Sequence, residues 1–215
     1  MSAPPPLVLL VDDDEEVRRS LALLVRAAGY EVLAWGSATE FLRQTLPDRP
    51  GCLVLDLQLP GLDGLGLLET LRELESPPPI VFLTGHGDIR TSVRAMRNGA
   101  FDFLEKPVEA DCLLGAIGRA VAHDRAARGR RGAERAARAR FETLTAREVD
   151  VCRLVAAGMP NKAIASQLGI SIKTVKVHRG RVFQKLGVAS LADLVRLAAV
   201  LPAADRSPTS SPEGG

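Results

Sequence analysis

Residues 7–25 read LVLLV-DDDEE-VRRSLALLV and contain the building unit of the first half of the chain. A short apolar run bounded by a polar turn predicts a buried strand, and apolar residues at a spacing of three to four predict a helix that packs on one face. The stretch therefore predicts a strand, an acidic turn and a helix. The apolar face of that helix comprises Val17, Leu21, Leu24 and Val25.

The same unit recurs down to about residue 123. Strands are expected at Leu7–Val11, 31–35, 52–55, 80–83 and 101–104, with helices at 17–28, from a capping box at Ser37–Glu40, at 65–74, at 89–97 and from about Glu109. Five β–α units of this length predict an α/β fold in which helices cover both faces of a parallel sheet. In such sheets, ligands bind beyond the carboxyl ends of the strands.

From Thr143 onward the pattern is purely helical. A capping box at Thr145–Glu148 starts one helix, Asn161 is expected to cap a short helix over 162–168, and Ser171 caps a longer one to about Leu186. Ser190–Asp193 starts a fourth helix. The second half is therefore predicted to be a small all-α domain.

Two further segments complete the expected organisation. Residues 124–140 are rich in Ala and Arg but contain Gly129 and Gly132, which predicts a partly helical linker. The Pro/Ser/Gly-rich residues 202–215 are expected to form a disordered tail. The predicted divisions are 5–123 for the α/β domain, 124–140 for the linker, 141–201 for the all-α domain and 202–215 for the tail.

Charge is divided unequally between the halves. Residues 1–123 carry 11 Lys/Arg and 18 Asp/Glu, a net of −7, whereas residues 124–215 carry 17 and 8, a net of +9. A basic half of this kind favours nucleic acid as a partner. Three cysteines without metal-ligand spacing, and no apolar run long enough for a signal peptide or a membrane span, favour a cytoplasmic protein without a membrane partner.

Polar residues collect at the expected strand ends. Asp12 and Asp13 follow the first strand, Asp56 ends the third, Thr84 ends the fourth, and Lys106 follows the fifth. Carboxylates brought together repel one another unless a cation joins them, and oxygen ligands of this kind suit Mg²⁺. One carboxylate could then act as a nucleophile toward a phosphoryl group, with Lys106 and Thr84 holding the phosphoryl oxygens.

Each element taken alone has a plainer explanation. An acidic run at a helix start commonly compensates the helix dipole, Thr-Gly at a strand end is commonly a turn, and a single lysine is commonly a surface residue. The joint arrangement, at successive strand ends, is what favours a site.

Four stretches resemble the receiver domain of two-component response regulators: Val11–Asp14, Leu55–Gly64, Leu83–Asp88 and Phe103–Pro107. This resemblance, over about residues 5–123, implies a flavodoxin-like strand order 2-1-3-4-5 and a cis Lys106–Pro107 bond. It also implies that Asp56 is the phosphoacceptor, that Asp12, Asp13, Asp56 and the Gln58 carbonyl hold Mg²⁺, that Thr84 and Lys106 bind the phosphoryl group, and that Phe103 is the switch aromatic.

In the second half, a tight Gly169 turn joins two helices, and the second helix is basic. Such a helix suits the major groove and its phosphates, although a charged amphipathic helix is often only a solvated face. Leu144–Glu148, Asn161–Ala165, Leu168–Ser171 and Thr174–Arg179 resemble the LuxR-type DNA-binding domain. By this resemblance the expected DNA contacts are Lys173, Thr174, Lys176, Val177, Arg179 and Arg181.

The two resemblances together identify the chain as similar to NarL/FixJ-family regulators, nearest the FixJ-like branch. They imply a phosphorelay in which a sensor histidine kinase phosphorylates Asp56, and the regulator then dimerises and binds two half-sites of promoter DNA, with RNA polymerase as a candidate partner. Receiver phosphotransfer and dephosphorylation would be its only catalysis. Two alternatives remain at this point: a metal-dependent phosphoesterase with Asp56 as turnover nucleophile, and a DNA binder that needs no phosphorylation.

Overall fold

The computed structural model describes residues 4–74, 76–85 and 96–200. The chain divides into two compact units, Met1–Arg128 and Gly129–Gly215. The helix expected over 89–97 falls mostly outside the described residues, and so does the tail expected over 202–215.

The first unit is built on a five-stranded parallel sheet with the order β2-β1-β3-β4-β5. This confirms the predicted α/β class and the 2-1-3-4-5 order. The central strands are buried along their whole length because they are apolar on both faces. The strands are β1 (Leu7–Val11), β2 (Glu31–Trp35), β3 (Gly51–Asp56), β4 (Ile80–Thr84) and β5 (Asp102–Glu105).

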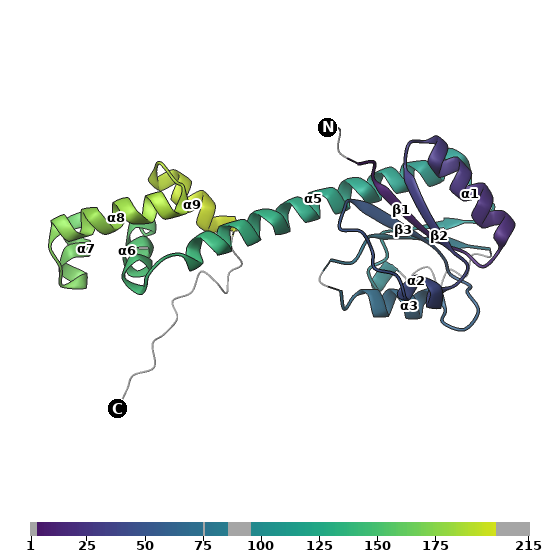
Figure 1. The fold of residues 1–215 in the computed structure, drawn as a ribbon, viewed down its shortest axis with the longest axis horizontal. Coiled ribbons are helices and arrows are strands. Elements are labelled where there is room, and N and C mark those ends of the chain that lie inside the picture. Colours follow the sequence, from purple (N-terminus) through teal and green to yellow (C-terminus); the bar gives the residue numbers. More distant parts are fainter. Residues whose placement is uncertain (1–3, 75, 86–95, 201–215) are drawn as a thin grey trace, which may run out of the picture. The chain divides into compact units, whose positions relative to one another are not determined.

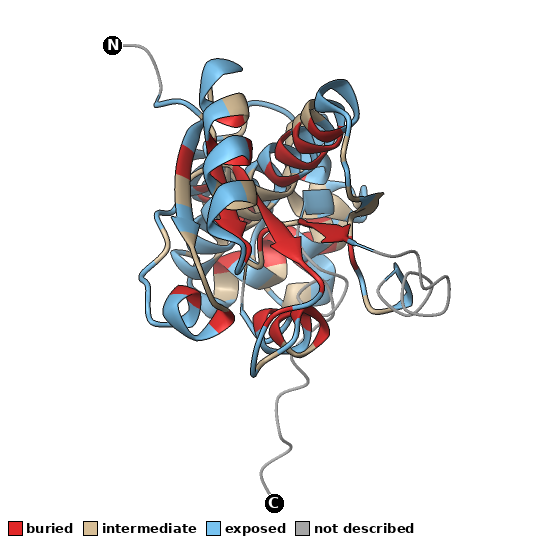
Figure 2. Ribbon diagram, turned by 90° about the vertical axis from the view of Figure 1, so that its right-hand side faces the viewer, coloured by how far each residue is buried: buried red, intermediate tan, exposed pale blue. Residues whose placement is uncertain are grey.

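Helices cover both faces of this sheet (Figure 1). Helices α2 (Ala38–Leu42) and α3 (Gly64–Leu71) pack on one face, and α1 (Glu15–Ala27) packs on the other with the first part of α5 (Ala110–Glu142). Successive strand residues alternate between the two cores: Leu53 and Leu55 face α2 and α3, whereas Val54 faces α1 and α5. Figure 2 shows the buried strands between helices whose outer surfaces are exposed.

Several predicted boundaries in this unit were wrong by one to three residues, and α3 and β5 are examples. Helix α3 was expected to reach Leu74 but ends at Leu71, since the N–H groups of Glu73 and Leu74 bond back three residues to Thr70 and Leu71 in a tightened last turn. Strand β5 was expected at 101–104 and lies at Asp102–Glu105.

The expected interruption of helix at Gly129 and Gly132 was also wrong, because α5 is continuous from Ala110 to Glu142. Each glycine costs a helix about 1 kcal/mol relative to alanine. The surrounding Ala and Arg residues are strong helix formers, so two isolated glycines do not break the helix.

The second unit is all α-helical, as predicted. Helices α6 (Ala146–Ala156), α7 (Asn161–Leu168), α8 (Ile172–Leu186) and α9 (Leu191–Val200) enclose one apolar core. The capping box of Thr145 and Glu148 is present at the start of α6, and Ser171 caps α8. The fully buried core side chains include Ile164, Val175, Val182, Leu186 and Leu194.

Asn161 does not cap α7 as expected. Pro160 occupies the cap position without a side-chain hydrogen bond, and Asn161 is the first residue of the helix. Its side-chain oxygen instead accepts a hydrogen bond from Nη1 of Arg179 at 3.2 Å, which ties α7 to α8.

Within the described ranges, none of the helices combines the length and the apolar character needed to cross a lipid bilayer.

Candidate functional site

The carboxyl edge of the sheet brings together the polar residues expected there. Asp12 follows β1, Asp56 ends β3, and Thr84 ends β4; all three are buried. The backbone N–H of Lys106, just after β5, donates to the Thr84 carbonyl at 2.6 Å and so fixes the root of the lysine at the same edge. Parallel strands therefore create this site because their carboxyl ends share one side.

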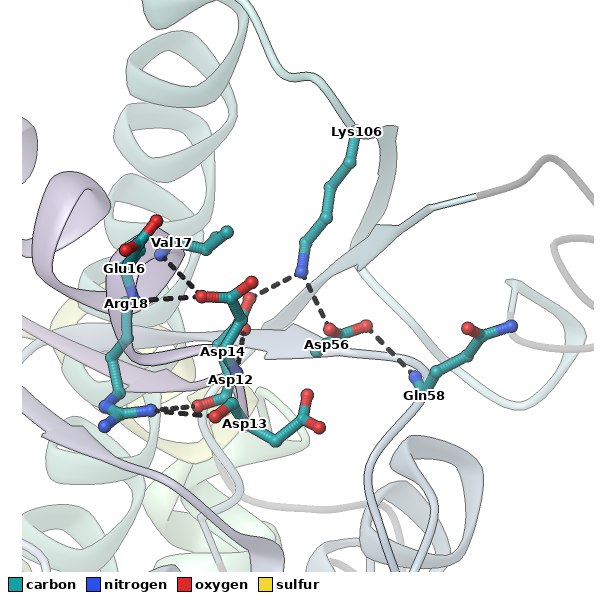
Figure 3. Close-up of polar contacts among 9 residues, drawn as sticks. All are labelled: Asp12, Asp13, Asp14, Glu16, Val17, Arg18, Asp56, Gln58 and Lys106. Atoms are coloured by element: carbon teal, nitrogen blue, oxygen red, sulfur yellow. Dashed lines mark hydrogen bonds and ion pairs between the residues drawn. The ribbon is translucent and has the colours of Figure 1, made fainter.

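Lys106 is the cation of this cluster (Figure 3). Its Nζ lies 2.6 Å from Oδ2 of Asp12 and 2.7 Å from Oδ2 of Asp56. One ammonium thus bridges two buried carboxylates that would otherwise repel each other.

Asp13 completes the group as an exposed carboxylate. Ligand oxygens of Asp12, Asp13 and Asp56 all lie within 4.8 Å of one another, a spacing that one metal ion can span. Three oxygen donors with one side open to water fit a hard divalent cation such as Mg²⁺, which keeps several water ligands. The residues present therefore fit the metal that the sequence predicted.

The acidic run after β1 serves two purposes. Asp14 is the N-cap of α1, where Oδ1 accepts the N–H groups of Glu16 and Val17 at 2.9 and 3.1 Å. Glu15 and Glu16 lie in the first turn, where negative charge favours the helix dipole. Asp12 and Asp13 belong to the candidate site. Compensation of the helix dipole, the plainer explanation of an acidic run, therefore applies only to residues 14–16.

Arg18 is a residue of this site that the sequence analysis missed. Its Nη1 donates to the backbone carbonyl of Asp12 at 2.7 Å and to that of Asp13 at 3.4 Å (Figure 3). The guanidinium therefore fixes the backbone that carries both carboxylates. The available signal was its position one turn into the helix that follows the acidic run.

Gln58 lies beside Asp56, and Phe103 lies within β5. The N–H of Gln58 donates to Oδ1 of Asp56 at 3.0 Å, so the backbone turns sharply around this carboxylate. The Phe103 ring lies against Phe82, with centroids 6.3 Å apart, and packs at the edge of the core shared with α3. The Lys106–Pro107 bond is cis, as expected.

The protonation equilibria of Asp12 and Lys106 reflect both burial and pairing. Burial raises the pKa of Asp12, against the hydrogen bond and charge of Lys106, which lower it. Burial lowers the pKa of Lys106, but its hydrogen bonds to Asp12 and Asp56 outweigh burial and leave the pKa above its ordinary value. Lys106 therefore stays cationic at neutral pH.

In the second unit, α8 presents most of the predicted DNA-contact residues to solvent. Lys173, Lys176, Val177 and Arg181 are exposed, and Thr174 is half-buried beside the Ser171 cap. The opposite side of the helix carries the buried Val175 and Val182. A basic outer surface with two exposed apolar side chains, Ile172 and Val177, suits phosphates and base edges in a DNA groove.

Arg179 is less free than its neighbours. Besides its bond to Asn161, its guanidinium lies 5.3 Å from the centroid of the Phe183 ring, in a cation–π contact. The structure therefore gives Arg179 a role in holding α7 to α8 that sequence analysis did not anticipate.

Comparisons with known proteins agree with both halves of this description. Residues 8–118 match the family described as "Response regulator receiver domain", and residues 142–198 match "Bacterial regulatory proteins, luxR family". The chain is 48% identical to Nodulation protein W of Bradyrhizobium diazoefficiens over 185 residues, covering 86% of this chain and 82% of that protein. It is 44% identical to the transcriptional regulatory protein FixJ of Rhizobium meliloti, covering 85% and 89%.

Solved structures give the same result. The response regulator StyR matches with a TM-score of 0.84 and 45% identity, covering 91% of this chain and 98% of that one. Full-length FixJ from B. japonicum matches with a TM-score of 0.56 and 38% identity, covering 92% and 98%.

The fold and site thus define a response regulator, in which a receiver domain is joined to a LuxR-type DNA-binding domain. Within that class, the chain belongs to the NarL/FixJ family of two-component transcriptional regulators. It is a regulator of transcription rather than a classical enzyme.

Proposed function

We propose that Asp56 is the residue through which this regulator is switched, by transfer of a phosphoryl group from a sensor histidine kinase. The observation that carries the proposal is the ammonium of Lys106, 2.7 Å from Oδ2 of the buried Asp56. A carboxylate oxygen of Asp56 attacks the phosphorus, the bond from phosphorus to the kinase histidine breaks, and an acyl phosphate forms. Lys106 and the Thr84 hydroxyl then hold the phosphoryl oxygens.

Asp12, Asp13, Asp56 and the backbone carbonyl of Gln58 would hold Mg²⁺. When bound, the ion neutralises charge on the transferred phosphoryl group. The support for this assignment is the 4.8 Å cluster of carboxylate oxygens, of which Asp13 is open to water. Arg18 keeps the backbone of Asp12 and Asp13 in place.

Phosphorylation is proposed to act on the β4–β5 surface. Thr84 would move toward the phosphoryl group, Phe103 would follow, and the altered surface would support a homodimer. The position of Phe103 at the edge of the core, against Phe82, supports its part in this step.

Paired DNA-binding domains would then contact two half-sites of promoter DNA. The proposed contacts are made by α8, with the exposed Lys173, Lys176 and Arg181 on phosphates and Val177 at base edges. Thr174 and Arg179, both half-buried, complete the proposed set, and RNA polymerase is a candidate partner at the promoter. We propose a cytoplasmic location, which the proposed DNA and kinase partners support. We further propose domain limits of 5–123 and 141–201, joined by a linker over 124–140 and followed by a tail over 202–215.

Intact-mass measurement tests the central step. Wild type and Asp56→Asn are each incubated with Mg²⁺ and acetyl phosphate, and a gain of one phosphoryl group on the wild type alone is expected. An equal gain on both proteins would mean that another residue is the acceptor. No gain on either, while a control receiver is labelled in the same buffer, would favour a DNA binder that needs no phosphorylation. Steady turnover of a phosphoester would favour a phosphoesterase.

A further inference from the structure

The receiver unit contains a second concave site, at the edge of the sheet opposite the carboxylate cluster. Its volume is about 370 Å³, and Leu7 and Gly51, which begin β1 and β3, contribute to its lining. Pockets of about 300–1,000 Å³ are the usual size for small-molecule ligands. The Asp56 site and its partners take no part in this cavity.

The walls of the cavity are mainly apolar. They include Phe41 and six leucines from strand β1, the α2 region and the α3 region. Two of these leucines, Leu42 and Leu74, are 41% and 46% exposed, so apolar surface continues from the cavity to solvent. The six are Leu7, Leu9, Leu42, Leu46, Leu71 and Leu74.

The acidic groups of the cavity already have partners. Asp124 is buried and accepts the Gly51 N–H at 2.9 Å and Nε of Arg128 at 2.7 Å. Arg128 also pairs with Asp48. A cationic ligand would therefore find no unpaired carboxylate among these lining residues.

Arg49 differs, because one of its donors is unsatisfied. Its Nη2 pairs with Glu31 at 2.5 Å and its Nη1 reaches the Pro5 carbonyl at 3.4 Å. Its Nε is buried and has no hydrogen-bond partner among the described residues, although Arg49 lines the cavity. A buried donor without a partner costs free energy that an incoming acceptor would recover.

We propose that this cavity is a binding site for a small, largely apolar molecule that carries a carboxylate or carbonyl oxygen. The apolar part lies among the leucines, and the oxygen accepts the Nε–H of Arg49 after the side chain turns this buried donor toward the cavity. The bound molecule would lie beside Asp124 and Arg128, the two residues through which α5 is bonded to β3 and Asp48.

Methyl NMR of the full chain, with leucine methyls labelled, tests the proposal with octanoate as the probe. Saturable shifts are expected for the six lining leucines, whereas Leu21 and Leu113, on the other face of the sheet, stay unchanged. Octylammonium, which has the same chain but no acceptor, should bind at least about tenfold more weakly.

Two variants locate the site. Thr70 is exposed and lines the cavity, so Thr70→Trp should fill it and weaken octanoate binding by about tenfold or more. The neighbouring Glu69→Trp, exposed on the same helix outside the lining, is the matched control and should bind like wild type. Arg49→Lys removes the Nε–H but keeps a cation for Glu31, and should abolish the preference for octanoate over octylammonium.

Three outcomes would overturn the proposal. The first is no saturable shift with octanoate, and the second is equal binding by wild type and Thr70→Trp. The third is equal affinity of wild type for octanoate and octylammonium, which would show that the ligand needs no hydrogen-bond acceptor. All readouts are independent of phosphorylation at Asp56.

Discussion

Lys106 and Asp56 are joined by a contact of 2.7 Å between Nζ and Oδ2 across a separation of 50 residues in the chain. The same Nζ lies 2.6 Å from Asp12, so the lysine offsets charge in a buried cluster before any phosphoryl group arrives. Its removal should therefore affect both the acidic pocket and the phosphoryl-transfer step.

Lys106→Gln is expected to slow phosphorylation of Asp56 by about 100-fold, the usual effect of losing one preorganised donor to a developing charge. The rate is measured by intact mass against time with acetyl phosphate and Mg²⁺. Lys162→Gln, in α7 of the DNA-binding unit, is the control. A wild-type rate for Lys106→Gln would remove the lysine from the transfer step.

Asp13→Asn should weaken Mg²⁺ binding by more than about tenfold without loss of folding, because the exposed carboxylate is a proposed ligand. Trp35, the single tryptophan of the chain, reports on the site, since its carbonyl accepts the Asp12 N–H at 3.3 Å. Fluorescence titration with Mg²⁺ is the measurement. Asp14→Asn, which preserves a good N-cap, should titrate like wild type, and an unchanged Asp13→Asn would exclude this residue as a ligand.

Lys173→Ala should weaken DNA binding about equally on all sequences and reduce the slope of log affinity against log salt by about 1, as expected for one lost phosphate contact. Anisotropy titrations at several salt concentrations give the slope. Arg196→Ala, on α9, removes an exposed cation paired with Asp193 and should leave the slope unchanged. An unaltered slope for Lys173→Ala would show that Lys173 does not contact a DNA phosphate.

Gly180→Ala should stabilise the DNA-binding unit by about 1 kcal/mol, because an added Cβ meets nothing within 4 Å and alanine is the better helix former. The change in unfolding free energy is measured by urea, from the transition in which this unit unfolds. Gly187→Ala is the matched contrast and should destabilise, since Gly187 ends α8 with φ +64°. Equal changes in unfolding free energy from the two substitutions would contradict the argument that Gly187, with its positive φ, disfavours alanine whereas Gly180 does not.

Glu148 should give the DNA-binding unit an acid-sensitive contribution to stability. Its hydrogen bond to Lys185, 2.6 Å long, and that to the Thr145 N–H lower its pKa from 4.5 to about 2. Because the folded pKa is the lower one, the contribution is complete above pH 4.5 and is lost as pH falls toward 2. The difference in unfolding free energy between wild type and Glu148→Gln should therefore shrink through that interval.

Lys185→Met provides the complementary measurement, since it removes the partner of Glu148. The difference between wild type and Lys185→Met should shrink over the same interval. If the difference in unfolding free energy from wild type stays constant from neutral to acid pH in both variants, the ion pair of Glu148 and Lys185 makes no pH-dependent contribution to stability.

The sequence predicted most of the α/β unit because its signals are local and repeated. The short length of apolar runs such as Leu7–Val11 favours buried strands, and the shared carboxyl edge then places Asp12 near Asp56. The 2.6 and 2.7 Å contacts of Lys106 could not be predicted, because they depend on side-chain conformation.

Other features were missed because they depend on contacts between distant segments. The bond between Asp124 and the Gly51 N–H joins residues 73 apart, and no periodic pattern marks either one as a partner. Asn161 was expected to cap its helix, since its residue type favours that position, but a contact with Arg179 in another helix uses the side chain instead. Local propensity is overridden where tertiary contacts provide a better partner.

The alternation along β3 has a consequence for insertions and deletions. Leu53 and Leu55 belong to one core and Val54 to the other, so deleting a single residue from this strand would exchange the two sets of side chains at once. The same shift would turn Asp56 away from Lys106. Changes in chain length should therefore be selected against within β3, and chimeric receivers should be joined outside Gly51–Asp56.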